Sequence, residues 1–137
     1  MPALKGVLET VLYVDDMERA KVFYDRLFAM PMVFSDQRMC AYDVGGHSLL
    51  LLFIRGESLR TIPLPDGAIP PHDGHGPYHV AFSIGADEVA AWEERLAQLG
   101  IAIESRANWP RGGTSLYFRD PDGHLLELAT PGLWKGY

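Results

Sequence analysis

The sequence predicts an α+β fold made of two βαβββ modules, whose curled mixed sheets enclose a cleft. The same order of elements, one strand, one helix and three strands, occurs twice along the chain. The two leading strands begin at Glu9 and His79, which sets a repeat of 70 residues (79 − 9). Gly46-His47 and Gly123-His124 mark the last hairpin turn of each module. One module alone has an open sheet and too small a core, whereas two can curl their sheets around a shared cleft with the helices outside.

Module one is expected to cover residues of about 6–55. Its first strand spans 8–14, where β-branched and aromatic residues dominate. A helix over about 16–28 follows, with Asp15 as its N-cap and Glu18 completing a capping box. Three more strands are then predicted, at 32–35, 38–44 and 47–54, with Gly45-Gly46 as the turn between the last two.

Module two, about 77–131, repeats this order after a segment rich in Pro, Gly, His and Asp, 56–76, which is predicted to be a loop. It begins with a strand at 79–84 and continues with a helix that Gly100 ends. Its further strands are expected at 101–104, 114–119 and 124–129, with Asp120-Pro121-Asp122-Gly123 as the last turn. The whole chain, 1–137, is therefore predicted to be a single domain, and an ordinary α+β sandwich without a cleft is the alternative.

Composition limits the classes of protein and partner. Hydrophobic residues make up 47% and charged residues 22% of the 137 residues, a globular balance that can form a core without disulfides. The net charge of −6, without a stripe of Lys and Arg, argues against nucleic acid as a partner. No apolar run approaches the roughly 20 residues of a membrane helix. The single Cys40 has no internal disulfide partner, so a reducing compartment, the cytoplasm, is the expected location.

The alternation of side chains along the strands indicates which residues face the cleft. The more apolar face of each leading strand should lie under its helix, which leaves Glu9 and His79 on the concave side. In the closing hairpin, a left-handed bulge at the last turn glycine places Tyr117 opposite Glu127. One face of this hairpin is then uniformly apolar, and the other carries Ser115, Tyr117, Arg119 and Glu127.

Glu127 lies in the middle of the apolar run Leu125–Ala129, which is the sharpest anomaly in the chain. A charge there needs a partner or a metal, unless it faces solvent on a half-exposed strand. Each of the other two residues also has an ordinary explanation when taken alone. Glu9 lies near a strand start and can face solvent, and His79 can be a hydrogen-bonded core histidine. Their common face and their equivalent places in the two modules nevertheless favour a joint role for all three.

Three runs carry the most distinctive patterns, namely Leu8–Ala20 with Phe23-Tyr24, Gly76–Phe82, and the closing hairpin Tyr117–Leu128. They resemble the corresponding parts of the glyoxalase/bleomycin-resistance/extradiol-dioxygenase family, also called the vicinal oxygen chelate superfamily. The resemblance covers nearly the whole chain outside 56–76. It implies the fold described above and a divalent metal bound by Glu9, His79 and Glu127, although the family usually has His or Gln at the first of these positions.

The departures from the family narrow the chemistry. A fourth ligand of some lyases falls on Leu50 or Leu51, and its absence counts against a standard glyoxalase I, while Glu9 counts against an extradiol oxygenase. One histidine and two carboxylates suit Mn(II), Fe(II), Zn(II) or Ni(II), and the sequence does not choose among them. The resemblance implies a metal that acts as a Lewis acid on two oxygens of a small-molecule substrate, in lyase, isomerase or dioxygenase chemistry.

Substrate contacts are expected from the polar face of the closing hairpin. Ser115 and Tyr117 match substrate-contacting positions of fosfomycin-modifying transferases, and Arg119 is a further candidate. Trp109 and Arg111 are expected to have surface or structural roles, with lining of the cleft or clamping of an acid group as the alternative. Nothing beside Cys40 marks an activated thiolate. Solvated positions in loops or turns are expected for His47, His72, His75 and His124.

Two other interpretations of the function stay open. Bleomycin-sequestering relatives use this fold as a drug-binding groove without a metal or catalysis, and an acidic chain suits a cationic drug. The other interpretation is a divergent paralogue with a vestigial site. The resemblance also implies a homodimer, and a twofold dimer is the commonest soluble assembly.

Overall fold

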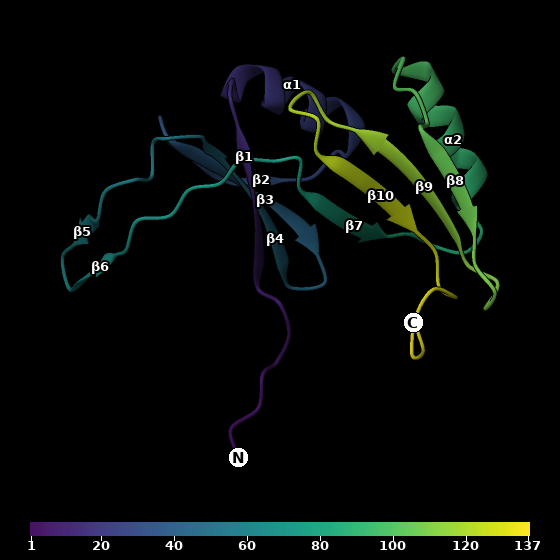
Figure 1. Ribbon diagram of the computed structural model, residues 1–137, viewed down its shortest axis with the longest axis horizontal. Coiled ribbons are helices and arrows are strands. Elements are labelled where there is room, and N and C mark those ends of the chain that lie inside the picture. Colours follow the sequence, from purple (N-terminus) through teal and green to yellow (C-terminus); the bar gives the residue numbers. More distant parts are fainter. The chain divides into compact units, whose positions relative to one another are not determined.

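The computed structural model describes residues 1–137, which form two compact units, Met1–His75 and Gly76–Tyr137. Each unit has a four-stranded sheet and one helix (Figure 1). The first contains β1 (Glu9–Val14), α1 (Met17–Leu27), β2 (Met32–Ser35), β3 (Met39–Gly45), β4 (Ser48–Ile54), β5 (Ile62–Leu64) and β6 (Gly67–Ile69). The second contains β7 (His79–Ser83), α2 (Val89–Gln98), β8 (Ser105–Asn108), β9 (Thr114–Arg119) and β10 (Leu125–Ala129).

The two four-stranded sheets share one topology. Their strand orders are β1-β4-β3-β2 and β7-β10-β9-β8. In each sheet the leading strand pairs in parallel with the last strand of its own unit, and the remaining pairs are antiparallel. The α+β class, the mixed sheets and the repeated βαβββ order are therefore confirmed. The single domain, with modules at about 6–55 and about 77–131 around a shared cleft, stays a prediction.

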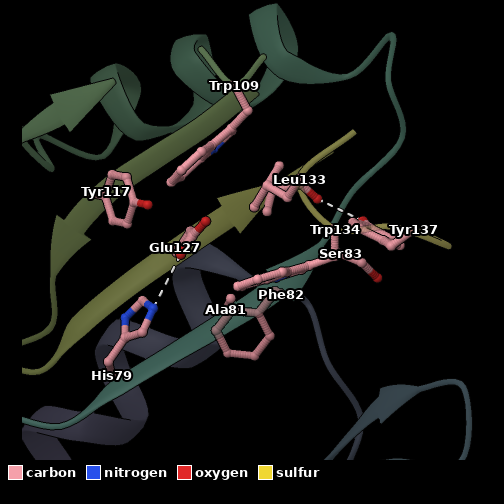
Figure 2. Close-up of a pocket in the computed structure, with 11 residues that line it drawn as sticks. His79, Ala81, Phe82, Ser83, Trp109, Tyr117, Glu127, Leu133, Trp134 and Tyr137 are labelled. Atoms are coloured by element: carbon pink, nitrogen blue, oxygen red, sulfur yellow. Dashed lines mark hydrogen bonds and ion pairs between the residues drawn. The ribbon is translucent and has the colours of Figure 1, made fainter. Parts of the chain in front are cut away.

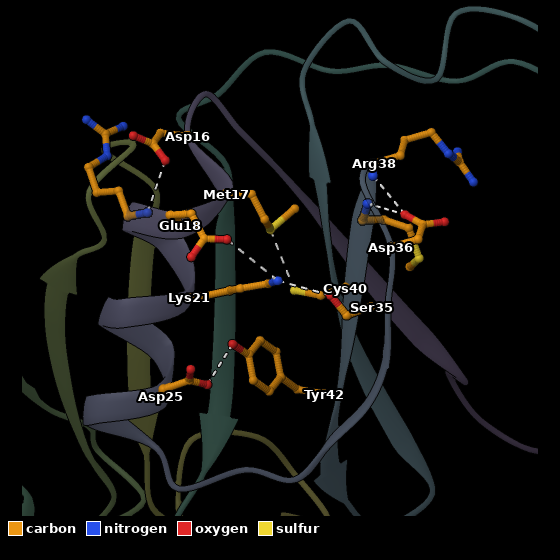
Figure 3. A network of polar contacts seen from close by, with 12 residues as sticks. Asp16, Met17, Glu18, Lys21, Asp25, Ser35, Asp36, Arg38, Cys40 and Tyr42 are labelled. Atoms are coloured by element: carbon orange, nitrogen blue, oxygen red, sulfur yellow. Dashed lines mark hydrogen bonds and ion pairs between the residues drawn. The ribbon is translucent and has the colours of Figure 1, made fainter.

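Helix α1 covers one face of the first sheet. The rings of Tyr24 and Tyr42 lie 6.4 Å apart. The Tyr42 hydroxyl donates to Oδ1 of Asp25 at 2.8 Å (Figure 3). Sγ of the buried Cys40 lies 3.7 Å from Sδ of Met17. Burial raises the pKa of the Cys40 thiol, so this cysteine packs as a small apolar residue and holds no reactive thiolate.

The other face of the first sheet is apolar as well. Its cluster consists of Met39, Ala41, Leu51 and Phe53, with Val11, Tyr13 and Leu49 packed against it. His72, from the segment after β6, lies 4.7 Å from Phe53 ring to ring, and its Nδ1 lies 2.6 Å from the Tyr13 hydroxyl. The expectation of a solvated His72 was therefore wrong, because the ring of this residue has both an aromatic and a polar contact.

Helix α2 covers the corresponding face of the second sheet, where it packs on β9. The apolar face predicted for the closing hairpin is fully buried, as is the one buried residue of α2. These side chains are Leu96, Leu116, Phe118, Leu126 and Leu128. Neither helix of the protein has the length and apolar character that a membrane-spanning helix requires.

Two local predictions in the first unit were wrong. The N-cap of α1 is Asp16, whose Oδ1 accepts from the backbone nitrogen of Arg19 at 3.1 Å, while Asp15 forms an ion pair with Arg55 at 2.5 Å. The segment 56–76 is more than a loop, since β5 and β6 pair in it as an antiparallel hairpin.

The strand expected at 101–104 lies later in the chain, at Ser105–Asn108. Gly100 has a positive φ of 71°, and the backbone nitrogen of Ile101 donates to the Leu96 carbonyl at 2.9 Å. These residues therefore close the end of α2 and are not available for a strand. Pairing with β9 begins at Ser105, which lies opposite Tyr117.

Candidate metal and ligand site

The closing hairpin places Glu127 as the sequence predicted. Glu127 pairs with Tyr117, and Ala129 pairs with Ser115, on antiparallel strands. Because Leu126 and Leu128 point to the helix side of the sheet, Glu127 points to the side without a helix. Glu127 is nevertheless only 5% exposed, so its carboxylate needs polar partners.

His79 is the first of these partners. It begins β7 opposite Leu125, and its Nδ1 lies 2.9 Å from the Leu125 carbonyl oxygen. A carbonyl only accepts hydrogen bonds, so Nδ1 carries the ring hydrogen and donates it. Nε2 then turns to the other side and lies 3.1 Å from Oε1 of Glu127.

Ser115 binds the second oxygen of the same carboxylate, and Trp109 in turn binds Ser115. The fully buried Ser115 hydroxyl lies 2.5 Å from Oε2 of Glu127 and donates to it. The indole Nε1 of Trp109 donates to Oγ of Ser115 at 2.8 Å. Beside them, burial raises the pKa of the Tyr117 phenol, and the negative charge of Glu127 adds to the rise.

A pocket of about 450 Å³ opens beside this group of residues (Figure 2). Its polar lining comes from His79, Ser83, Tyr117 and Glu127. Most of the rest is aromatic or apolar, from Phe82, Trp109, Leu133, Trp134 and Tyr137. A concave, largely apolar pocket with a few convergent polar groups has the usual form of a small-molecule site.

The His79 and Glu127 atoms that face each other fit a divalent metal. Nε2 is the ring nitrogen without hydrogen when the imidazole is neutral, and Oε1 is the carboxylate oxygen that Ser115 leaves free. Ligand atoms of a transition metal lie ~2.1 Å from it, so two ligands of one ion are at most about 4 Å apart. The 3.1 Å between these two atoms satisfies that limit. The Leu125 carbonyl and Ser115 supply the outer hydrogen bonds that orient metal ligands in proteins.

Glu9, the third predicted ligand, begins β1 in the first unit, opposite Leu49, and is exposed. Within either unit, no three His, Cys, Asp or Glu side chains gather as a metal-binding group. The structure thus brings two of the three predicted ligands together, and the complete set of Glu9, His79 and Glu127 stays a prediction.

Strand register identifies the residue of the first unit that corresponds to Glu127. Glu127 pairs with Ala81, two residues after the start of β7, and Leu51 pairs with Val11, two residues after the start of β1. Leu51 is buried in the apolar cluster of its sheet. Of the two residues predicted for the place of a fourth ligand, Leu50 and Leu51, the register matches Leu51 to Glu127, and no carboxylate lies there.

The predicted substrate-binding residues have different surroundings. Tyr117 lines the pocket, whereas Ser115 does not line it and is hydrogen-bonded to Glu127, which does. The Arg119 guanidinium forms an ion pair with Glu104 at 3.0 Å and donates to the Gly123 carbonyl at 3.1 Å. Arg119 therefore does not lie across Glu127, and substrate binding by these three residues stays a prediction.

Other side chains differ from expectation. The ring of His124 is buried, stacks on Tyr78 at 5.5 Å, and accepts from the Tyr78 backbone nitrogen at 2.9 Å, so it is not solvated. Trp109 lines the pocket in addition to its hydrogen bond. The contributions of Leu133, Trp134 and Tyr137 were missed altogether. Three large apolar residues within the last five of a chain were the only signal that could have revealed them.

Comparisons with known proteins identify the family of this chain. The family model of the Glyoxalase/Bleomycin resistance protein/Dioxygenase superfamily matches residues 6–128, so the chain belongs to that superfamily. The metallothiol transferase FosB of Lysinibacillus sphaericus is 31% identical over 129 residues, which are 93% of this chain and 83% of that protein.

Two solved structures extend the comparison. The crystal structure of lactoylglutathione lyase from Agrobacterium tumefaciens has a TM-score of 0.87 and 33% identity, covering 97% of this chain and 98% of that one. The fosfomycin resistance protein FosX of Listeria monocytogenes was solved in complex with Mn(II) and sulfate. It has a TM-score of 0.66 and 24% identity over 93% of this chain and 91% of that one, which shows likeness of fold alone.

Proposed function

We propose that this protein is a divalent-metal-dependent enzyme of its superfamily, with His79 and Glu127 as metal ligands and Glu9 as the third. The observation that carries the proposal is the distance of 3.1 Å between His79 Nε2 and Glu127 Oε1. The other polar atoms of the two side chains, Nδ1 and Oε2, are hydrogen-bonded to the Leu125 carbonyl and to Ser115. A buried carboxylate and a histidine of defined tautomer at the edge of a ligand-sized pocket suit Mn(II), Fe(II), Zn(II) or Ni(II).

The names of the relatives support metal-dependent enzyme chemistry. FosB is a metallothiol transferase, the FosX structure holds Mn(II), and a third relative is a lactoylglutathione lyase. In the proposed site, the metal would supply Lewis-acid activation of two oxygens of a small-molecule substrate, in lyase, isomerase or oxygenase chemistry. His79 and Glu127 would hold the ion, the Leu125 carbonyl and Ser115 would orient them, and the apolar walls would exclude water from the substrate.

Metal binding by the full chain, purified without a histidine tag, tests this proposal. Mn(II) titration followed by electron paramagnetic resonance should show one tight site per chain. His79→Ala should abolish this site while the circular dichroism spectrum stays unchanged, because the imidazole lies on the face away from the helix. Glu9→Ala should weaken it, whereas equal affinity would remove Glu9 from the proposed set.

His47→Asn is the matched control for the loss of an imidazole. His47 is exposed in a turn with φ of 64°, a conformation that Asn tolerates. This variant should bind Mn(II) as the unchanged protein does. Equal Mn(II) affinity of His79→Ala and the unchanged protein would reject the proposed metal site.

A small-molecule binding protein without catalysis is the second candidate, because most of the pocket lining is aromatic or apolar. Such a protein would bind an organic ligand with the same affinity in the presence and absence of Mn(II). Calorimetry of an organic ligand with and without Mn(II) therefore distinguishes the two candidates.

The homodimer is also a proposal, drawn from the habit of the family. One chain has a mass of 15.2 kDa. Light scattering that gives this mass throughout the micromolar range would reject the dimer, and twice this mass would support it.

A further inference from the structure

We infer that the pocket takes a substrate with a flat, apolar, uncharged body, such as an aromatic ring, and not an anion of the phosphonate type. This inference rests on the proposed function, since the oxygens of the substrate would meet the metal at His79 and Glu127. It adds the chemical class of the rest of the substrate. Side chains of the second unit that lie outside the metal site would select this class.

Aromatic side chains from two separate segments bound the pocket. Trp109 comes from the connection between β8 and β9, and Trp134 and Tyr137 come from the C-terminal segment after β10. Trp109 is 38% exposed, Tyr137 40% and Trp134 74%, although large aromatic side chains are ordinarily covered in a folded protein. Exposed aromatic side chains that gather around a pocket mark a surface that a ligand covers, and their faces favour stacking with a second flat ring.

No lysine or arginine lines the pocket. Recognition of a phosphonate, phosphate or carboxylate usually needs such a side chain, because a desolvated anion needs charge-assisted hydrogen bonds. Arg119 is the cation on the same strand face, and Glu104 and the Gly123 carbonyl already occupy its guanidinium. A metal held by His79 and Glu127 would offset the charge of Glu127, and the rest of the lining offers no cation, while the chain carries a net charge of −6. The electrostatic surroundings therefore disfavour an anionic body.

The C-terminal wall is built into the second unit. The Tyr137 hydroxyl donates to the Ala129 carbonyl at 2.8 Å, and the Gly132 nitrogen donates to the Tyr137 carbonyl at the same distance. The Gly113 nitrogen donates to the Gly132 carbonyl at 3.3 Å, which ties the segment to the start of β9. Because both of its ends are anchored, the segment places Trp134 beside the pocket as part of its wall.

Two probes that each carry a pair of adjacent hydroxyls, phenolic in one and aliphatic in the other, and that differ in their bodies test the inference together with the Trp134 variants. Naphthalene-2,3-diol has a flat uncharged body, and dihydroxypropylphosphonic acid, which one FosX structure contains, has a small anionic one. Isothermal titration calorimetry with the Mn(II)-loaded full chain should give at least tenfold tighter binding of the diol. Trp134→Ala should weaken diol binding about tenfold, as expected for the loss of one stacking partner, and leave Mn(II) affinity unchanged.

Two further variants complete the experiment. Trp92→Phe alters the tryptophan of α2, which does not line the pocket, and should leave both affinities unchanged. Trp134→Lys adds a cation to the wall and should shift the preference toward the phosphonate. Equal or tighter binding of the phosphonate by the unchanged protein, or no effect of Trp134→Ala on the diol, would overturn the inference. Diol binding that depends on Trp134 but not on Mn(II) would uphold it while rejecting the metal-dependent enzyme.

Discussion

Ser115 Oγ lies 2.5 Å from Oε2 of Glu127, and this hydroxyl has a fixed direction because the Trp109 indole donates to the same oxygen. A hydroxyl has one hydrogen. Because the indole N–H already occupies a lone pair of Oγ, the hydroxyl hydrogen points in another direction, here toward the carboxylate. Oε2 is thereby occupied, and Oε1 is the oxygen left to face His79. Two residues outside the proposed ligand set thus decide which oxygen of Glu127 would meet a metal.

Ser115→Ala should therefore affect both stability and metal binding. Glu127 is almost fully buried, and the loss of its hydrogen bond leaves a buried acceptor unsatisfied, at a cost of about 1–3 kcal/mol in the free energy of unfolding. The loss of an outer hydrogen bond to a ligand should weaken Mn(II) binding about 10–100-fold. Urea denaturation and Mn(II) titration measure the two effects.

Ser105→Ala is the matched control, because Ser105 is exposed on the neighbouring strand β8. It should change neither quantity by a measurable amount. If Ser115→Ala left the affinity for Mn(II) unchanged while its stability fell, the Ser115–Glu127 contact would be purely structural.

Tyr117 should make the protein less stable in alkali. Burial raises its pKa above the ordinary value of 10.0, and the charge of Glu127 raises it further. Above pH ~10 the unfolded chain loses this proton while the folded chain keeps it, so the stabilising contribution is present below that pH and is lost as the pH rises through the raised pKa. Tyr117→Phe should lose less stability than the unchanged protein over this range in urea denaturation. Parallel losses in the two proteins would contradict the expectation.

The closing hairpin shows what the sequence could predict. Its register was predictable because a slip by one residue would move both Leu126 and Leu128 out of the apolar core and would move Glu127 into it. The predicted metal ligands on this side of the chain, His79 and Glu127, lie together for the same reason. Alternation in two strands, paired in parallel, places both on the face away from the helix.

Features set by distant contacts could not be predicted. The run Ser105–Asn108 has little intrinsic preference for a strand and becomes β8 because β9 needs a partner on its free edge. The wall formed by Trp134 and Tyr137 depends on the hydrogen bond from the Tyr137 hydroxyl to the Ala129 carbonyl and on that from the Gly113 nitrogen to the Gly132 carbonyl, which no local sequence pattern predicts. The outer acceptor of His79 is likewise a backbone carbonyl, which no side-chain pattern reveals.

Asp16 and Asp15 give a local test of the helix start. Asp16 caps α1 by accepting from the Arg19 nitrogen, so Asp16→Ala should lower the free energy of unfolding by about 1 kcal/mol. Asp15 forms a partly exposed ion pair with Arg55, and Asp15→Ala should cost less, within ~1 kcal/mol. Urea denaturation of the two variants side by side measures the difference. A larger loss for Asp15→Ala would restore Asp15 as the residue that matters at this helix start.

Gly132→Ala should detach the C-terminal wall from the pocket. Gly132 has a φ of 107°, and a Cβ added there would collide with the backbone of Gly113 as well as strain the chain. Gly136 has a φ of 89° but open space around it, so Gly136→Ala has similar backbone strain without the collision. Because Trp134 lies between these two glycines, Gly132→Ala should weaken binding of an aromatic ligand much more than Gly136→Ala does.

Calorimetry with naphthalene-2,3-diol measures this difference, and limited proteolysis should show earlier cleavage after residue 130 in Gly132→Ala alone. Equal behaviour of the two variants would mean that the close approach of Gly113 and Gly132 does not hold the wall in place.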